Sequence, residues 1–574
     1  MMQDDVARRT GAGAVVTAAL FGVALAFPAA VCSQPADLVF RGEHIVTLAP
    51  PAEALAVRGE DIVAVGRWQD VAPLVGDDTR VVELGDRALI PGFIDAHGHL
   101  VMAAQTVDLA NVASPPVGPV ETLADLIAEL SRFARARELA DDDWVVGFGY
   151  DDSLIAERRH PTAADLDAAF PDRPDYLVHV SGHLAAVNSR ALEIAGVGAE
   201  TPDPPGGHIR RLADGRRPNG VLEESARGLL ERARPVPTGD EMQASLRRAQ
   251  DLYARNGITT GQDGFTSAAG LALLEAAAAR DEIVMDVITF PAGRGFSDER
   301  LGELAVGNYR GRLKVGGVKL SLDGSPQGKT AYLTQPYAVP PAGQKPGYRG
   351  YPAMEQEQVD ALFARFLGQR IPILAHANGD AAADQLLHAM EAVERDGDLG
   401  DHRTVMIHSQ IVRRDQLERI ARLRVVPSFF VAHTFFWGDW HRDSVLGHDR
   451  AYFISPARTA SEFGIRYTFH NDAPIVPPDM LRLIWTGVNR RTRSGDILGP
   501  AERVSTEMAL RAVTIEAAYQ NFEEDQKGTL EVGKQADLVV LSADPLFTPA
   551  PLLKDIAVVE TISRGRSIYL RDGS

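Results

Sequence analysis

Short runs of alternating apolar and polar residues occupy both ends of this chain, between turns that contain glycine. Alternation with a period of two is typical of half-buried β-strands. The amino-terminal runs start at Ala36, Ala54, Ile62 and Arg80, and the carboxyl-terminal runs span 528–541, 556–562 and 567–570. We expect these strands to pair into one small β-sandwich built from both termini.

The middle of the chain alternates between apolar runs and amphipathic stretches. Eight runs predict strands, at residues 89–95, 258–262, 284–290, 314–320, 371–376, 404–408, 425–430 and 465–470. Helical periodicity marks several of the stretches between them, such as 354–368 and 380–395. Eight strands with intervening helices predict an α/β fold, a (β/α)8 TIM barrel. The gap after the first strand is too long for one helix, so residues from about 103 to 237 predict an inserted subdomain over the barrel mouth.

The boundaries of these patterns divide the 574 residues into four parts. We expect a signal peptide at 1–33, the first half of the sandwich at 34–90, the barrel with its insertion at 91–510, and a helix followed by the second half of the sandwich at 511–574.

The predicted signal peptide begins with Arg8 and Arg9, followed by an apolar stretch over 12–31 and small residues before Gln34. This order is typical of a cleaved export signal, so we expect a periplasmic or secreted protein. The alternative is a retained membrane anchor. Lipidation of Cys32 and the twin-arginine export route remain open.

Composition limits the classes of partner and the residue types that can serve as metal ligands. The formal net charge of -19 argues against nucleic acid or an anionic membrane as a partner. The partner that we expect is a small-molecule substrate. We expect no stable membrane partner after signal cleavage, and a homo-oligomer remains open. Cys32 is the only cysteine, so ligands for a metal must come from His, Asp, Glu or a modified Lys.

His97 and His99 close the first predicted barrel strand and are the most informative residues of the chain. Side chains alternate along a strand, so two histidines one residue apart point the same way and both reach one metal ion. By itself this spacing also occurs by chance on protein surfaces. The residues at the ends of later strands give the pair its weight.

Four further side chains able to bind metal stand at or just past strand ends: Lys319, His376, His408 and Asp472. Active sites of TIM barrels lie where the carboxyl ends of the strands meet, so we expect all six side chains to converge there. Taken singly, each histidine is more typical of a hydrogen-bonded core residue, and Asp472 of a helix cap. Taken together, they predict a metal site, with zinc as the expected ion and one or two ions per chain.

Lys319 is unusual in such a set because an ammonium group repels metal ions. Burial in an apolar strand lowers the pKa of a lysine, and the neutral amine can take up carbon dioxide. The resulting carbamate is an anionic oxygen ligand able to bridge two ions. The alternative is a barrel lysine paired with a carboxylate such as Asp323.

The segment 91–99, Pro-Gly-Phe-Ile-Asp-Ala-His-Gly-His, resembles the first-strand signature of the amidohydrolase superfamily. The motifs at 147–151, 181–189, 205–209, 220–224, 318–325, 376–380 and 533–538 resemble its third family, that of N-substituted formamide deformylase. The resemblance covers nearly the whole chain after the signal. It implies a metal-dependent hydrolase with a β-sandwich beside the barrel, and ligand roles for His97, His99, Lys319, His376, His408 and Asp472.

We therefore expect an enzyme that hydrolyses a carbon–nitrogen bond other than a peptide bond, with Asp472 as general base and acid beside a metal-activated hydroxide. Hydrolysis of an ester, lactone or cyclic amide, or deamination, is the alternative on the same site. A non-catalytic binding protein is the alternative of another class. Weaker expectations assign substrate contacts to Asp151, His183, Asp323 and His433.

Overall fold

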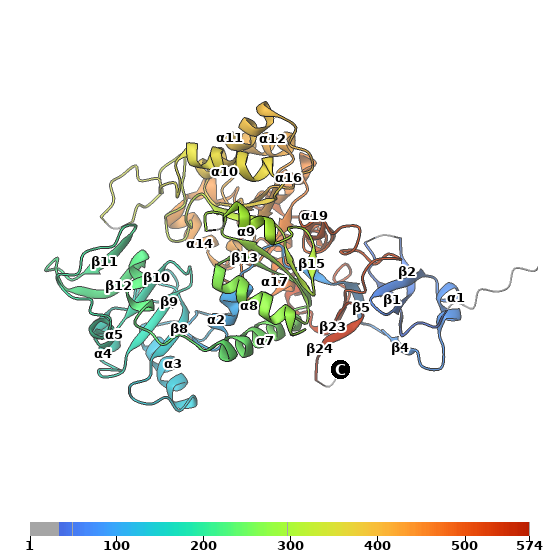
Figure 1. The fold of residues 1–574 in the computed structure, drawn as a ribbon, viewed down its shortest axis with the longest axis horizontal. Coiled ribbons are helices and arrows are strands. Elements are labelled where there is room, and N and C mark those ends of the chain that lie inside the picture. Colours follow the sequence, from blue (N-terminus) through green and yellow to red (C-terminus); the bar gives the residue numbers. More distant parts are fainter. Residues whose placement is uncertain (1–33, 49, 296, 342, 573–574) are drawn as a thin grey trace, which may run out of the picture.

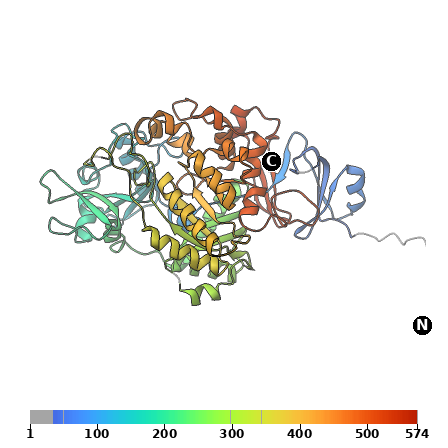
Figure 2. The same ribbon diagram turned by 90° about the horizontal axis from the view of Figure 1, so that it is seen from above.

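The structure is a computed structural model that describes residues 34–48, 50–295, 297–341 and 343–572. The expected signal peptide at 1–33 lies outside the described residues. Three parts follow one another along the long axis, with the terminal strands at one end, the barrel-like domain in the middle and the insertion at the other end (Figures 1 and 2). Among the described residues, no helix combines the length and the apolar character that a membrane crossing requires.

Strands from both ends of the chain form one mixed eight-stranded sheet, in the order β24-β23-β22-β5-β1-β2-β3, with β4 beside β1. These strands are β1 (Leu38–Ile45), β2 (Ala52–Arg58), β3 (Asp61–Gly66), β4 (Arg80–Glu83), β5 (Ala88–Pro91), β22 (Leu538–Leu541), β23 (Val558–Ser563) and β24 (Arg566–Leu570). The two ends meet where β22 runs antiparallel to β5. Strands from both termini pair as expected, but they form one continuous sheet and not the two sheets of the expected β-sandwich. It encloses an apolar cluster with residues from both termini, such as Leu55 and Leu538.

The barrel-like domain consists of two five-stranded sheets, β15-β16-β14-β13-β6 and β17-β18-β19-β20-β21. All pairings in them are parallel except that of β15 with β16. The bounds are β6 (Phe93–Ile94), β13 (Ile258–Thr266), β14 (Asp286–Pro291), β15 (Tyr309–Arg310), β16 (Leu313–Val315), β17 (Val318–Ser321), β18 (Ile373–Ala377), β19 (Val405–His408), β20 (Val426–Phe429) and β21 (Thr468–Phe469).

The two sheets meet along both edges. A parallel bridge from Ala292 to Lys319 joins the first sheet to β17. On the opposite side, the backbone N–H of His99 donates to the carbonyl of Ala473 at 2.7 Å, and that of Asp472 donates to the carbonyl of His97 at 3.0 Å. The expected TIM barrel is therefore present as a barrel-like α/β arrangement, without one closed ring of paired strands in the described part of the chain.

The prediction of one continuous strand, the fourth, over residues 314–320 is wrong. The structure has β16 and β17 there, separated by Gly316 and Gly317. A side chain at Gly317 would collide with the carbonyl of Pro372, so the glycine lets the chain pass close to the neighbouring segment. The break lets β16 pair with β14 while β17 begins the second sheet.

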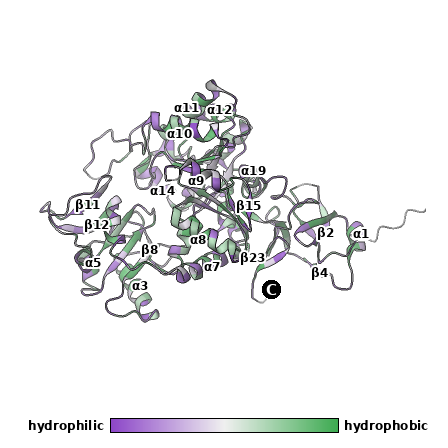
Figure 3. Ribbon diagram, in the orientation of Figure 1, coloured by the Kyte–Doolittle hydropathy of each residue, from purple (hydrophilic) through white to green (hydrophobic). Residues whose placement is uncertain are grey.

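Helices cover the outside of both sheets (Figures 1 and 2). They include α7 (Gly239–Arg255), α8 (Ala268–Ala279), α10 (Gln356–Gly368), α11 (Asp380–Asp396), α12 (Arg414–Leu423), α17 (Met480–Asn489), α18 (Thr506–Ala512) and α19 (Ile515–Gln520). Their sequences explain where they start: Thr238 and Glu241 form a capping box at α7, and Ser267 caps α8. Figure 3 shows that α8 is hydrophobic over most of its length, and it buries Leu271 and Leu274 against the strands.

A six-stranded sheet follows α2 (Leu100–Thr106) and lies within the range expected for the insertion. Its strands are β7 (Ala110–Asn111), β8 (Val145–Tyr150), β9 (Asp175–His179), β10 (Leu184–Val187), β11 (Gly207–Arg211) and β12 (Pro218–Glu224), with α3 (Leu123–Ala136), α4 (Ala163–Asp167) and α5 (Ser189–Ile194) between them. Two apolar clusters draw on residues of this sheet. The insertion therefore has a core of its own beside the mouth of the barrel.

Lys527 links the terminal sheet region to the barrel through a buried ion-pair network. Its Nζ lies 2.5 Å from Asp286 Oδ2 of β14 and 3.1 Å from Glu523 Oε2.

Removing one partner of a buried pair leaves an uncompensated charge. We expect Lys527→Met to lower the free energy of unfolding by about 3 kcal/mol, seen as a lower midpoint of denaturation. Lys554→Met is the control, because Lys554 pairs with Asp555 at the surface; equal midpoints for both variants would contradict the prediction.

Candidate metal centre

His97 and His99 lie just beyond β6 rather than on it. The two rings lie together as predicted, but strand alternation, the predicted reason, does not orient them. Backbone hydrogen bonds to the segment after β21 hold this turn instead, and they bring His99 Nε2 to 3.0 Å and His97 Nε2 to 3.5 Å from Asp472 Oδ1. The two rings stand edge to face with their centres 5.0 Å apart.

Lys319 lies in the middle of β17 and is buried. Its Nζ is 2.9 Å from His97 Nε2. Loss of water around the amine on burial lowers the pKa of Lys319 to about 7. The amine therefore exists largely uncharged at mildly alkaline pH, which is the form that can bind a metal or react with carbon dioxide.

His376 in β18 and His408 at the end of β19 complete the set, with ring centres 4.5 Å apart. All six predicted ligand residues line one cavity of about 510 Å³ at the carboxyl ends of the strands. His97, His408 and Asp472 each offer one ligand atom, and these atoms lie within 4.8 Å of one another. The structure thus brings together the residues that the sequence predicted to converge.

Burial sets the charge of these groups. It lowers the pKa values of His97 and His408 well below the ordinary range, so both imidazoles are neutral and have a nitrogen lone pair to offer. Burial acts to raise the pKa of Asp472, but the hydrogen bond and charge of His99 outweigh it and keep that pKa below its usual value. Neutral imidazoles around an ionised carboxylate are a donor set that fits a divalent cation.

Three of the histidines are oriented by hydrogen bonds through Nδ1. Gln262 Oε1 lies 2.8 Å from Nδ1 of His97, and Asp323 Oδ1 lies 3.0 Å from Nδ1 of His376. Nδ1 of His408 lies 3.2 Å from Nε2 of His470, which in turn contacts Ser428 Oγ at 2.8 Å. These contacts engage Nδ1 of each ring, as in the partner networks of known metal-binding histidines. Nε2 of His97 faces Lys319, and Nε2 of His376 lies 3.3 Å from Asn378 Nδ2.

Gln262 and His470 were missed by the sequence analysis. Each is the last residue of a predicted strand, 258–262 or 465–470, which is the position that the barrel argument singled out elsewhere. Neither side chain reaches the cavity, so the strand-end signal alone does not separate a ligand from a residue that holds a ligand in place.

Asp323 holds several protein groups beside the cavity. Its carboxylate accepts hydrogen bonds from the backbone N–H groups of Tyr332, Asn378 and Gly379 at 2.8–3.0 Å, in addition to the contact with His376. Asp323 also lines the cavity of the metal site, and the substrate contact expected of it stays a prediction. The alternative pairing with Lys319 is replaced by the contact with His376.

The other three expected substrate residues divide between two cavities. His183 lines the metal-site cavity and pairs with Glu224 at 3.0 Å, while the buried His433 lines it with Nδ1 2.8 Å from His441 Nε2. Asp151 lies instead in the wall of an adjoining pocket and accepts a 2.8 Å hydrogen bond from Trp437 Nε1.

The insertion adds one group that the sequence analysis did not foresee as functional. Ser181 Oγ lies 2.8 Å from His179 Nδ1, and His179 Nε2 lies 3.1 Å from Asp152 Oδ1. Ser181 also lines the metal-site cavity, so this chain of contacts ends at the place where a substrate would bind.

The fold and the site define a metal-binding hydrolase: neutral nitrogen donors and one carboxylate converge at the carboxyl ends of parallel strands, in a cavity large enough for a small molecule. Comparison with known families agrees. The model of the amidohydrolase family matches residues 80–569, so the chain belongs to this family. The resemblance found in the sequence is confirmed, as is the prediction of an enzyme acting on carbon–nitrogen bonds other than peptide bonds.

Two relatives match this chain along nearly their whole length. The N-substituted formamide deformylase of Arthrobacter pascens is 29% identical over 543 residues, which cover 91% of this chain and 96% of the relative. The putative amidohydrolase YtcJ of Bacillus subtilis is 28% identical and covers 90% and 96%. An uncharacterised metal-dependent hydrolase from Pyrococcus furiosus has the same fold, with a TM-score of 0.69, 24% identity and coverage of 89% and 99%.

Gly264, in β13, packs directly against the ring of His97. A methyl group at Gly264 would overlap that ring, so we expect Gly264→Ala to displace His97 and to remove most of the bound metal, measured by elemental analysis. The control is Gly368→Ala at the end of α10, where an added methyl group meets nothing within 4 Å. Full metal content in Gly264→Ala would show that His97 is not a ligand.

Proposed function

We propose that this protein is a zinc-dependent amidohydrolase that cleaves the carbon–nitrogen bond of a small, non-peptide amide. The observation that carries the proposal is the convergence of His97, His99, Lys319, His376, His408 and Asp472 on one cavity. Family membership supports the hydrolytic chemistry, and the ligand types support zinc.

The residues fall into two groups around the buried lysine. His97 and His99 contact Asp472, and His376 pairs with His408, whose ligand atom also lies within 4.8 Å of those of His97 and Asp472. We propose that these groups would hold the metal and that Lys319, as its carbamate, would supply them with an anionic oxygen ligand. Zinc, when bound, supplies a water molecule of lowered pKa and polarises the substrate carbonyl.

Asp472 is the proton carrier in this proposal. It is ionised, and His99 holds one of its oxygens at 3.0 Å. We propose that it accepts the proton of the attacking water and passes it to the amide nitrogen as the carbon–nitrogen bond breaks. The leaving amine then departs neutral, and the carboxylate is restored.

N-substituted formamides are the substrates that we propose to test first, because the relative from Arthrobacter pascens is an N-substituted formamide deformylase. We also propose that the protein is exported. That proposal depends on the arginine pair and the apolar stretch within residues 1–33, and it is tested by comparing periplasmic and cytoplasmic fractions of a bacterial host.

Removing the proton carrier tests the mechanism. We expect Asp472→Asn to lower kcat for formamide hydrolysis by about 1000-fold, because the amide cannot take the proton, while most of the metal stays bound through the histidines. The matched control is Asp449→Asn, whose side chain is fully exposed. Unchanged turnover in Asp472→Asn would refute the role of Asp472.

Removing the lysine tests the metal arrangement. We expect about two zinc ions per wild-type chain by elemental analysis, after loading in the presence of bicarbonate, and one or fewer in Lys319→Ala. Lys554→Ala should keep the wild-type content, because Lys554 lies at the surface beside Asp555. Equal zinc content in Lys319→Ala and wild type would exclude a lysine-bridged pair of ions. No stoichiometric metal in the wild type would overturn the proposed function itself.

A further inference from the structure

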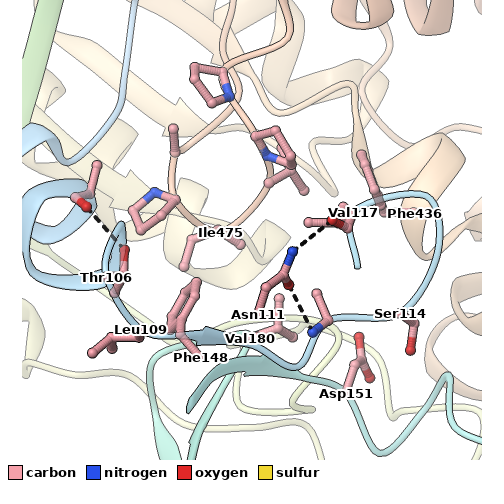
Figure 4. A pocket seen from close by; sticks show the side chains of 18 of the residues that line it. Thr106, Leu109, Asn111, Ser114, Val117, Phe148, Asp151, Val180, Phe436 and Ile475 are labelled. Carbon is pink, nitrogen blue, oxygen red and sulfur yellow. Dashed lines mark hydrogen bonds between the residues drawn. The ribbon is translucent and has the colours of Figure 1, made fainter. Parts of the chain in front are cut away.

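A second cavity, of about 280 Å³, lies between the insertion and the barrel-like domain (Figure 4). One wall is the segment 473–478, which follows Asp472 and contains three prolines. The opposite wall comes from the insertion, with Phe148 of β8 and the segment after β7. In Figure 4 the side chain of Ile475 points across the cavity towards Phe148.

A single turn of the chain lies between this pocket and the metal-site cavity. The backbone N–H of Ile475 donates to the carbonyl of Asp472 at 2.9 Å, so the residue that we propose as proton carrier and Ile475 share one tight turn. Ile475 lines both cavities. A molecule that spans the two would therefore pass beside Asp472.

The walls of the pocket are mainly apolar. Leu109, Val117, Phe148, Val180 and Ile475 face it, and the amide of Asn111 is already hydrogen-bonded to the backbone of its own loop. Ligand sites typically combine such a surface with a few polar groups that fix orientation.

Two residues that line the pocket, Ser114 and Tyr253, have a buried hydroxyl without a partner in the described part of the chain. Ser114 is 5% exposed, and its hydroxyl makes no hydrogen bond within the described part of the chain. A buried hydroxyl without a partner is costly, so its presence here points to a ligand that completes it. Asp151, the other polar side chain on this side, already accepts from Ser153 and Trp437.

We propose that this pocket binds the apolar substituent of the substrate, an alkyl chain or a single aromatic ring, while the amide group lies among the metal-binding residues. Where that alkyl chain or ring carries a polar atom, the hydroxyl of Ser114 can hydrogen-bond to it. This inference rests on the proposed amide hydrolysis and deepens it: the substrates are amides with one bulky apolar group on a small reacting head.

Binding tests the pocket without requiring turnover. Calorimetry on Asp472→Asn protein, with N-methyl-, N-butyl- and N-hexylformamide as probes, should show an affinity that rises about three-fold for each added methylene group. Adding Val117→Trp, which fills the pocket from its wall, should weaken N-hexylformamide binding at least ten-fold. Val532→Trp is the matched control, because Val532 is 62% exposed and lies in the segment before β22.

Kinetics with otherwise wild-type protein then separate this inference from the proposed reaction. The ratio of kcat/KM for N-hexylformamide to that for N-methylformamide should fall at least ten-fold in Val117→Trp and stay unchanged in Val532→Trp. An affinity independent of chain length, or equal binding in both tryptophan variants, would overturn the pocket assignment. Chain-length-dependent binding without formate release by the wild type would leave the pocket assignment standing and refute the proposed reaction.

Discussion

Two backbone hydrogen bonds, His99 to Ala473 and Asp472 to His97, are the constraint on which the metal centre depends. They join the ends of the first and last strands of the barrel-like domain, which are separated by almost the whole of its sequence. Because the bonds involve the backbone of the ligand residues themselves, the two histidines and the carboxylate are placed together before any metal binds. The cavity, the ion-pair distances and the adjoining pocket all follow from this junction.

The backbone of two residues that line the cavity adopts conformations that few residues favour. His408 and Asp472 have φ angles of 72° and 55°, in the left-handed region, where a residue with a β-carbon is strained by about 1 kcal/mol. Such strain persists where surrounding contacts over-determine it, and it gathers at functional sites. In both residues the turn redirects the chain just after a strand and points the side chain into the cavity. These backbone conformations lower the local stability of the chain and direct the two side chains into the cavity.

The sequence foretold which residues converge on the cavity better than the reasons for their placement. His376 and His408 were predictable because apolar runs of strand length end at them, and parallel strands bring their carboxyl ends together. The orientation of His97 and His99 was not predictable, because it depends on hydrogen bonds to a segment far along the chain. The same holds for Asp323, whose donors come from two separate loops, and for the break at Gly316 and Gly317, which depends on the nearby carbonyl of Pro372.

The pairing of β22 with β5 also has a consequence for the order in which the enzyme is completed during synthesis. β5 leads directly into β6 and the segment of His97 and His99, and it pairs with both β1 and β22, although β22 begins only at Leu538, near the carboxyl end. A ribosome that has made all six of the residues that converge on the cavity has still not made β22. A chain cut short after Asp472 would therefore hold those residues without one of the two strands that flank β5.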